Sequence, residues 1–424
     1  MTTSTKWPRR LDFRDYVSPG DTVVWSHAGA EPQTLLQLLL DQRHALGGPI
    51  DVFLTGVSFS QTLRPEHADV VRFSSIGGIG THARLARAGC LEVVPCRASD
   101  LPQLFASRRI RVDVAMVSGS LPDAEGRVSL GPTVAFSRSM LAAARVALLE
   151  INPNVPYVMG DGLVDLSRFD AVIASDGPLV AAPPNERQLS SVTERLCENV
   201  ATLIPDRCTL QVGFGSVSRA LPRYLAGRRD LGIHSAIMTD ELVDLIECGA
   251  INGSAKELDL DLAVTGELLG TERLYRFADR NPQIRLRDAT YMLSERVLGA
   301  FESLVSVNSA LQVDLTGQVN AESRDGVHVG AVGGSVDFVR AAARSSRGAS
   351  IIALASTTSS GRSRIVPELD HGIVSTARCE VEFVVTEHGV ADLRGRPLRE
   401  RARALIAIAD PDHRAALSAV EVMS

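Results

Sequence analysis

The chain carries one structural pattern twice, and this repetition restricts its possible folds more than any other feature. Residues 22–40 contain a β-rich run, a loop with glycine, and then a leucine-rich segment with helical spacing. Residues 208–226 repeat this order, with a glycine loop at 213–217 and a helical segment over 220–226. Each copy therefore predicts a strand, a loop and a helix.

A second motif is repeated in the same relative position. Residues 112–131 and residues 313–330 each predict a strand, a polar turn containing Asp and Gly, and a second strand. Both matches together favour an internal duplication. Since strands alternate with helices, we expect tandem α/β domains with open, mostly parallel sheets. One domain is expected over residues 1–188 and the other over 189–424. They are joined near Pro183-Pro184, because paired prolines fit neither a helix interior nor a central strand.

The composition excludes several classes of function. The net charge of −6 gives no electrostatic reason to expect a nucleic acid or an anionic membrane as a partner. No run approaches the ~20 apolar residues of a membrane helix, and no signal-peptide stretch follows the polar N-terminus, so a cytoplasmic protein is expected. The six cysteines form no C-x-x-C pair and have no histidine at metal-ligand spacing, so no metal is expected. Only Lys6 and Lys256 could supply an amine for Schiff-base chemistry.

Three loops offer backbone or hydroxyl groups to a ligand. The loop at 213–217 follows a predicted strand, so its backbone amides could hold a phosphate, although a tight structural turn is the alternative. Gly333 and Gly334 could place amides around an oxyanion, with a plain turn as the alternative. The hydroxyl-rich segment around Thr357 could bond phosphate or pantetheine groups, or form a surface loop. The predicted ligand contacts of the first loop are Gly213, Phe214, Gly215, Ser216 and Val217.

Two histidines and two glutamates are candidates for acid–base or substrate-binding roles. His234 could act as a general base, with a buried structural histidine as the alternative. Glu241 lies seven residues further on, but a carboxylate in the first turn of a helix needs no catalytic role. His27 and Glu31 occupy the loop of the first repeat. They could face a ligand, or simply precede a helix with Pro32 in its first turn.

A series of short motifs is spread over nearly the whole chain. They occupy residues 27–32, 122–131, 152–156, 213–215, 232–240, 307–319, 332–334, 363–367, 385–391 and 398–402. Each is weak alone, but in combination they resemble the acetyl-CoA hydrolase/CoA-transferase family, in particular its 4-hydroxybutyrate and butyrate CoA-transferase-like members.

This resemblance implies two CoA-transferase-type α/β domains in tandem, a homodimer, and coenzyme A or acyl-CoA as a substrate held in the cleft between the domains. It also implies a small-molecule acceptor for the transferred group. CoA contacts are then expected at the 213–217 loop and at Leu311, Gly333, Gly334 and Thr357. Glu31 and Ser335 are assigned to the substrate pocket.

The resemblance breaks at Ala236. In the family a glutamate follows the His-Ser pair, here His234 and Ser235, and attacks the thioester to give a glutamyl-CoA intermediate. A methyl group cannot act as a nucleophile. We therefore predict direct acyl transfer to an amine, a hydroxyl or water, or a cyclisation within one substrate. Two alternatives stay open: a CoA-transferase whose carboxylate has moved, most simply to Glu241, and a CoA-binding subunit without catalysis.

Overall fold

The first repeat forms strand β1 (Thr22–Trp25), a short turn and helix α1 (Gln33–Gln42) in the computed structural model, which describes residues 7–183 and 189–420. The second repeat forms β10 (Thr209–Val212), a glycine loop and α6 (Ser216–Ala220). The predicted order of strand, loop and helix is confirmed in both copies. The helical segment expected over 220–226 is confirmed as far as Tyr224, and it tightens into a 3-10 helix from Leu221. Proline at the next position supplies no N–H for an α-helical hydrogen bond.

The chain divides into two compact units. The first contains residues 1–184, 264–292 and 327–330, and the second contains 185–263, 293–326 and 331–424. Two segments from the second half of the sequence thus pack with the first unit, which the sequence pattern does not anticipate. The linker expected near Pro183-Pro184 lies largely outside the described residues. The boundary between residues 188 and 189 stays a prediction.

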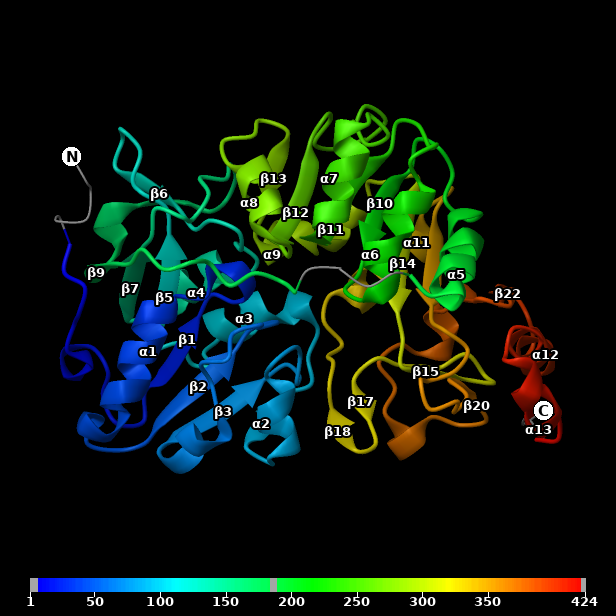
Figure 1. Ribbon diagram of the computed structural model, residues 1–424, viewed down its shortest axis with the longest axis horizontal. Coiled ribbons are helices and arrows are strands. Elements are labelled where there is room, and N and C mark those ends of the chain that lie inside the picture. The colour runs from blue at the N-terminus through cyan, green and yellow to red at the C-terminus, as the bar shows by residue number, and fades with distance from the viewer. Residues whose placement is uncertain (1–6, 184–188, 421–424) are drawn as a thin grey trace. The chain divides into compact units, whose positions relative to one another are not determined.

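The first unit is built on a seven-stranded sheet in the order β4-β3-β2-β1-β5-β7-β9 (Figure 1). Its pairings are parallel, with Val23 of β1 opposite Val52 of β2 and Val114 of β5. The remaining strands of this sheet are β2 (Ile50–Leu54), β3 (Val71–Ser75), β4 (Leu91–Val93), β5 (Val114–Gly119), β7 (Val146–Ile151) and β9 (Ala171–Ala174). The other elements of the unit are β6 (Arg127–Ser129), β8 (Leu163–Asp165), β12 (Ala263–Leu268), β13 (Ile284–Leu286), β18 (Val327–His328), α2 (Ala83–Arg87), α3 (Leu101–Ala106), α4 (Ser137–Ala143), α8 (Glu272–Ala278) and α9 (Ala289–Met292).

The second unit has its main strands in the order β11-β10-β14-β19-β21-β22. Figure 1 labels β10, β11, β14 and β22 of this sheet. All of these pairings are parallel up to β21, and β22 closes the edge in the antiparallel direction. The strands are β11 (Gly232–Met238), β14 (Leu304–Ser309), β19 (Ala349–Ala353), β21 (Phe383–Thr386) and β22 (Gly389–Asp392). A small sheet contains β15 (Gln312–Asp314), β16 (Val319–Asn320) and β20 (Ile365–Val366), and β17 is Ser323–Arg324. The helices are α5 (Ser191–Ala201), α7 (Asp240–Glu247), α10 (Glu295–Leu298), α11 (Ser335–Arg344), α12 (Leu398–Ala407) and α13 (Pro411–Ser418).

The two sheets share their strand order. β2-β1-β5-β7-β9 in the first unit corresponds to β11-β10-β14-β19-β21 in the second, and in each the first strand of the repeat lies between its sequence neighbour and a later strand. This confirms the predicted α/β fold with two mostly parallel, open sheets. Each sheet also has a point, at β1/β5 and at β10/β14, where the strand order reverses. Ligands of such sheets bind at the carboxyl ends of the strands beside that point.

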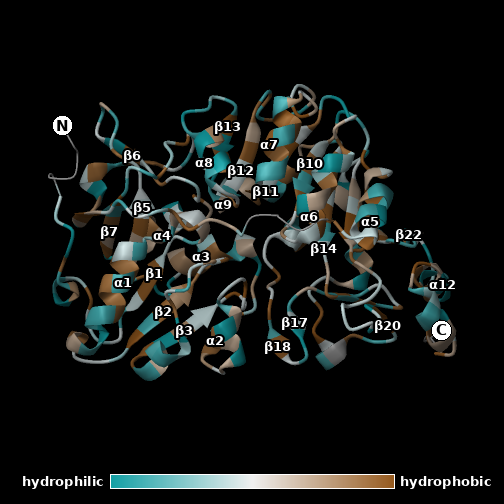
Figure 2. Cartoon of the chain, viewed as in Figure 1, coloured by the Kyte–Doolittle hydropathy of each residue, from teal (hydrophilic) through white to brown (hydrophobic). Residues whose placement is uncertain are grey.

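The cores lie on the strands, which are buried on both faces as parallel strands usually are. All four residues of β1 and all five of β19 are buried. Figure 2 shows hydrophobic residues along the strands and mixed hydropathy on helices such as α1 and α5. Helix α11 packs its buried face against β14 and β19. Within residues 7–183 and 189–420, no helix combines the length and hydropathy of a membrane span.

A buried lysine ties strand β11 to the chain segment that precedes β12. The Nζ of Lys256, a residue only 4% exposed, donates to the carbonyl oxygens of Ile233 at 2.9 Å and Leu262 at 2.8 Å. Burial lowers the pKa of this amine to about 8. Gly232 makes room for its stem, because a Cβ there would lie 2.4 Å from Lys256 Cγ.

We expect Lys256→Met to destabilise the protein by about 2 kcal/mol, because each buried carbonyl that loses its donor costs roughly 1–3 kcal/mol and relief of the buried charge offsets part of that. Urea unfolding at pH 7 measures the change. Arg296→Met, on the surface helix α10, is the matched control. An unchanged unfolding midpoint in Lys256→Met would show that the two hydrogen bonds contribute nothing net.

Candidate active site

The glycine loop of the second unit follows β10, beside the point where the strand order reverses. Gly215 has φ +147°, a conformation that side chains rarely permit. A Cβ on Gly213 would lie 2.7 Å from Asn308 Oδ1, so this glycine is needed for a close approach within the protein. Phe214 is 45% exposed at the tip, and Ser216 and Val217 begin α6. The close approach of Asn308 explains why residue 213 is a glycine without any ligand. Contact between the loop and CoA stays a prediction.

A buried polar network fixes the end of this loop to β14. Asn308 Nδ2 donates to Gln211 Oε1 at 3.1 Å and to Ser306 Oγ at 2.8 Å, and Ser306 Oγ donates to Gln211 Oε1 at 2.6 Å. On the other side, Ser235 Oγ donates to the carbonyl of Val212 at 3.0 Å. The strands that carry the candidate residues are therefore held in register by side chains as well as by the sheet.

Strand β11 places His234, Ser235 and Ala236 in succession. His234 is fully buried, with its ring centroid 4.9 Å from that of Phe301 and 6.4 Å from that of Phe338. This packing favours the structural alternative for His234. Ala236 is partly exposed towards the carboxyl end of β11, so the position itself is not sealed inside the core.

Glu241 lies in the first turn of α7, where the helix dipole favours a carboxylate. Its Oε1 lies 3.3 Å from Nε of Arg219, which belongs to α6. A carboxylate held by a guanidinium is a weaker nucleophile than a free one, because its charge is already neutralised. The helix position and the contact with Arg219 explain the presence of a carboxylate at position 241 without catalysis. A catalytic role for Glu241 stays a prediction.

Five further predicted site residues lie in loops or at a helix N-terminus of the second unit. Gly333 has φ +57°, and Gly334 caps the N-terminus of α11. Ser335 is the first residue of α11, and its hydroxyl donates to the carbonyl of Val332 at 2.8 Å. Leu311 follows β14 and Thr357 follows β19. Since β10, β14 and β19 are parallel neighbours, the structure brings the 213–217 loop, Leu311 and Thr357 to one edge of one sheet.

In the first unit, Glu31 is a buried carboxyl group that is 4% exposed. Burial raises its pKa to about 7, although hydrogen bonds and the nearby His27 oppose this shift. Ser58 Oγ and Gln33 Nε2 donate to its Oε2 at 2.9 and 3.0 Å. Glu31 thus titrates near neutral pH, which is unusual for a carboxyl group and typical of functional sites.

His27 lies between a hydroxyl group and a carboxylate that the sequence does not single out. Its Nδ1 is 2.9 Å from Thr55 Oγ1, and its Nε2 is 3.0 Å from Glu267 Oε2. Glu267 belongs to β12, whose backbone also receives hydrogen bonds from Val134 and Ala135 through Gly266. Its one sequence signal is an acidic residue inside the apolar run 262–269. This pair joins residues 240 positions apart, so spacing could not have revealed it.

Among the residues that the structure describes, no three His, Cys, Asp or Glu side chains lie close enough together to form a metal site. Two mostly parallel sheets with candidate residues after the carboxyl ends of their strands define an α/β protein that can bind ligands at those ends. Comparison with known proteins agrees. Residues 4–184 match the acetyl-CoA hydrolase/transferase N-terminal domain, and residues 270–420 match the C-terminal domain of the same name.

Relatives and solved structures match almost the whole chain. The 4-hydroxybutyrate coenzyme A transferase of Clostridium kluyveri is 36% identical over 397 residues, which are 93% of this chain and 92% of that protein. The crystal structure of RipA from Yersinia pestis has a TM-score of 0.89 and 31% identity, and covers 95% of this chain and 93% of that one. A 4-hydroxybutyrate CoA-transferase from Porphyromonas gingivalis has a TM-score of 0.79 and 34% identity, with 95% and 94% coverage.

The chain belongs to the acetyl-CoA hydrolase/transferase family. It is a CoA-transferase or acetyl-CoA hydrolase that acts on acyl-CoA thioesters, and the expectation of an enzyme is confirmed. Acyl-CoA is the substrate of this family.

Proposed function

We propose that this enzyme passes the acyl group of a bound thioester directly to an acceptor, without an enzyme-bound glutamyl-CoA. The observation that carries this proposal is Ala236, which follows His234 and Ser235 on β11, where the family resemblance expects the nucleophilic glutamate. The acceptor's amine, hydroxyl or water oxygen forms the new bond to the acyl carbon. The C–S bond then breaks, and the CoA thiolate leaves and takes up a proton. A nucleophile on the acyl chain itself would give a cyclic product.

The protein's part in such a reaction is positioning, proton removal and stabilisation of the oxyanion. Positioning of the two reactants contributes ~7–11 kcal/mol, and each oxyanion donor ~2.7–4 kcal/mol. Amides at Gly333 and Gly334 are the proposed donors. Of the sequence-derived bases, His27 has the most suitable surroundings, because Glu267 faces one ring nitrogen at 3.0 Å and Thr55 the other at 2.9 Å. We assign proton removal to this His27–Glu267 pair.

A CoA-transferase with a relocated carboxylate is the second candidate, and the names of the relatives favour it. In that reaction a glutamate carboxylate attacks the thioester, which forms an acyl-glutamyl anhydride and releases the CoA thiolate. The thiolate then attacks the glutamyl carbonyl, so that a glutamyl-CoA thioester forms and the acyl group leaves as a free carboxylate. Glu241 is the sequence-derived choice, and Glu267 is the choice that the structure adds. A cytoplasmic location and a homodimeric state stay predictions for both candidates.

Trapping of covalent intermediates separates the two candidates. We expect that a panel of acyl-CoAs with amine, alcohol and water acceptors releases free CoA thiol. After borohydride or hydroxylamine treatment, we expect the protein mass to be unchanged. An adduct mapped by peptide mass spectrometry to Glu241 or Glu267 would replace the first candidate by the second. No thiol release across the panel would contradict the first candidate, and no exchange of CoA onto an added carboxylate would contradict the second.

A further inference from the structure

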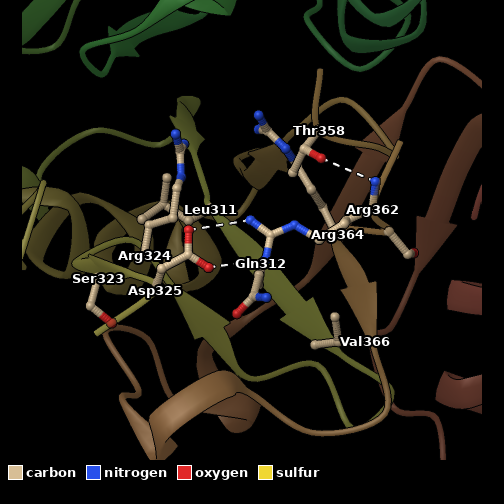
Figure 3. A pocket seen from close by; sticks show the side chains of 10 residues that line it. Leu311, Gln312, Ser323, Arg324, Asp325, Thr358, Arg362, Arg364 and Val366 are labelled. Atoms are coloured by element: carbon tan, nitrogen blue, oxygen red, sulfur yellow. Dashed lines mark hydrogen bonds and ion pairs between the residues drawn. The ribbon is translucent and has the colours of Figure 1, made fainter. Parts of the chain in front are cut away.

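The second unit contains a cavity of about 270 Å³ beside the small sheet of β15 and β20 (Figure 3). Cavities that enclose a whole drug-sized ligand are usually ~300–1,000 Å³, so this one fits a compact group. Most of the residues that line it are polar or charged. The lining consists of Leu311, Gln312, Ser323, Arg324, Asp325, Thr358, Arg362, Ser363, Arg364 and Val366.

The lining is cationic although the chain as a whole is acidic. Three arginines and one aspartate give it a net charge of +2, against −6 for the chain. Asp325 is already engaged, since its Oδ1 and Oδ2 accept from the Arg362 guanidinium at 3.0 and 3.2 Å (Figure 3). The charges of Arg324 and Arg364 are not balanced in this way. Burial lowers the pKa of Arg364, and the neighbouring charge of Arg324 lowers it further, while Glu387 acts in the opposite direction.

Two hydrogen-bond donors of the lining lack partners. Within the part of the chain that the structure describes, Nε of Arg364 and Oγ of Ser323 are buried and make no hydrogen bond. Ser323 is only 3% exposed. Buried donors without partners are rare, because each costs roughly 1–3 kcal/mol. Their convergence on one cationic cavity indicates a missing acceptor with several oxygens.

The backbone around these donors is fixed in advance. Arg364 N donates to the carbonyl of Ser356 at 2.8 Å, and its own carbonyl accepts from Val313 N at 2.9 Å. The loop between them is closed by Thr358, whose amide donates to the Arg362 carbonyl at 2.8 Å and whose hydroxyl accepts from Arg362 N at 3.1 Å. A ligand entering the cavity therefore orders little protein, which favours binding.

We propose that this cavity binds a phosphate dianion through the side chains of Arg324, Arg364 and Ser323. Guanidinium groups match phosphate oxygens in charge and in the geometry of their paired donors. The phosphate is carried either by the nucleotide end of acyl-CoA, a source that rests on the proposed function, or by free inorganic phosphate. Leu311 lies in the same lining, which makes it a neighbour of the bound group.

Calorimetric titration of the whole chain with CoA, with dephospho-CoA and with inorganic phosphate tests this proposal. Dephospho-CoA lacks the 3′-phosphate and is otherwise identical. The variants are Arg324→Gln and Arg364→Gln, and the control is Arg347→Gln, a surface arginine paired with Glu302. Thermal melting checks that each variant is folded, and Arg324, which is exposed, can be replaced with little risk to the fold.

We expect CoA to bind roughly tenfold more tightly than dephospho-CoA, a difference that both variants abolish and the control keeps. Equal binding of the two cofactors, together with inorganic phosphate binding that both variants weaken roughly tenfold, assigns the cavity to free phosphate. The proposal is wrong if the two arginine variants change neither the affinity ratio between CoA and dephospho-CoA nor the affinity for inorganic phosphate. Binding is measured without turnover, so a protein that binds phosphate in this way but releases no thiol refutes the proposed function alone.

Discussion

The Ala236→Glu variant is expected to form a covalent glutamyl-CoA thioester that the natural chain does not form. The proposed function takes position 236 as the place where the family resemblance expects a nucleophilic glutamate. Ser235 is still bonded to Val212, and position 236 is partly exposed. A carboxylate positioned against a bound thioester has an effective concentration of roughly 10⁵–10⁸ M. The adduct should therefore rise from undetectable to most of the protein.

Intact-protein mass spectrometry after incubation with acyl-CoA measures this adduct. Borohydride reduces the glutamyl thioester to an alcohol and releases the CoA thiol, and peptide mass spectrometry of the reduced residue confirms the site. Ala236→Gln is the control, because it has the same size without a nucleophilic oxygen. We expect the glutamate variant also to transfer CoA to an added carboxylate such as acetate. A folded glutamate variant whose mass does not change would show that position 236 does not face the thioester. The proposed function would then lose the observation on which it rests.

The fold was predictable because its signals are local. Each repeat places a strand, a loop and a helix within about twenty residues, and periodicity reports such elements directly. The shared sheet order follows, because parallel strands joined by helices have few allowed arrangements. The change to a 3-10 helix at Leu221 could also have been predicted, because Pro222 cannot donate the backbone hydrogen bond of an α-helix.

The parts that were not predictable depend on contacts between distant residues. His27 and Glu267 meet only because β12 packs with the first unit, and nothing in the spacing of the chain indicates this. Gly213 illustrates a different limit. A glycine after a strand is consistent with a ligand and with a close contact inside the protein, and only the position of Asn308 distinguishes them. Leu311 was assigned as a CoA contact, which stays a prediction, but the arginines that give the neighbouring cavity its charge were not singled out.

Stability should depend on pH through the buried carboxyl group of Glu31. Its pKa is about 7 in the folded protein and 4.5 in its ordinary environment. Below pH 4.5 the carboxyl group is protonated in both states and has no effect. Between pH 4.5 and 7 the unfolded chain releases the proton while the folded chain keeps it, so the free energy of unfolding falls as the pH rises. Above pH 7 the loss is complete and amounts to about 3 kcal/mol.

Glu31→Gln should remove this dependence, because glutamine stays neutral and its side-chain oxygen can still accept from Ser58 and Gln33. Urea unfolding at pH 5 and pH 8 gives the free energy of unfolding at each pH. We expect the fall between them to be smaller in the variant by about 2.5 kcal/mol, because part of the loss has already occurred at pH 5. Glu125→Gln is the control, because that carboxylate is exposed beside Arg127. Parallel pH profiles for the natural chain and Glu31→Gln would mean that Glu31 is ionised in the folded protein, and therefore that a cation or solvent reaches it.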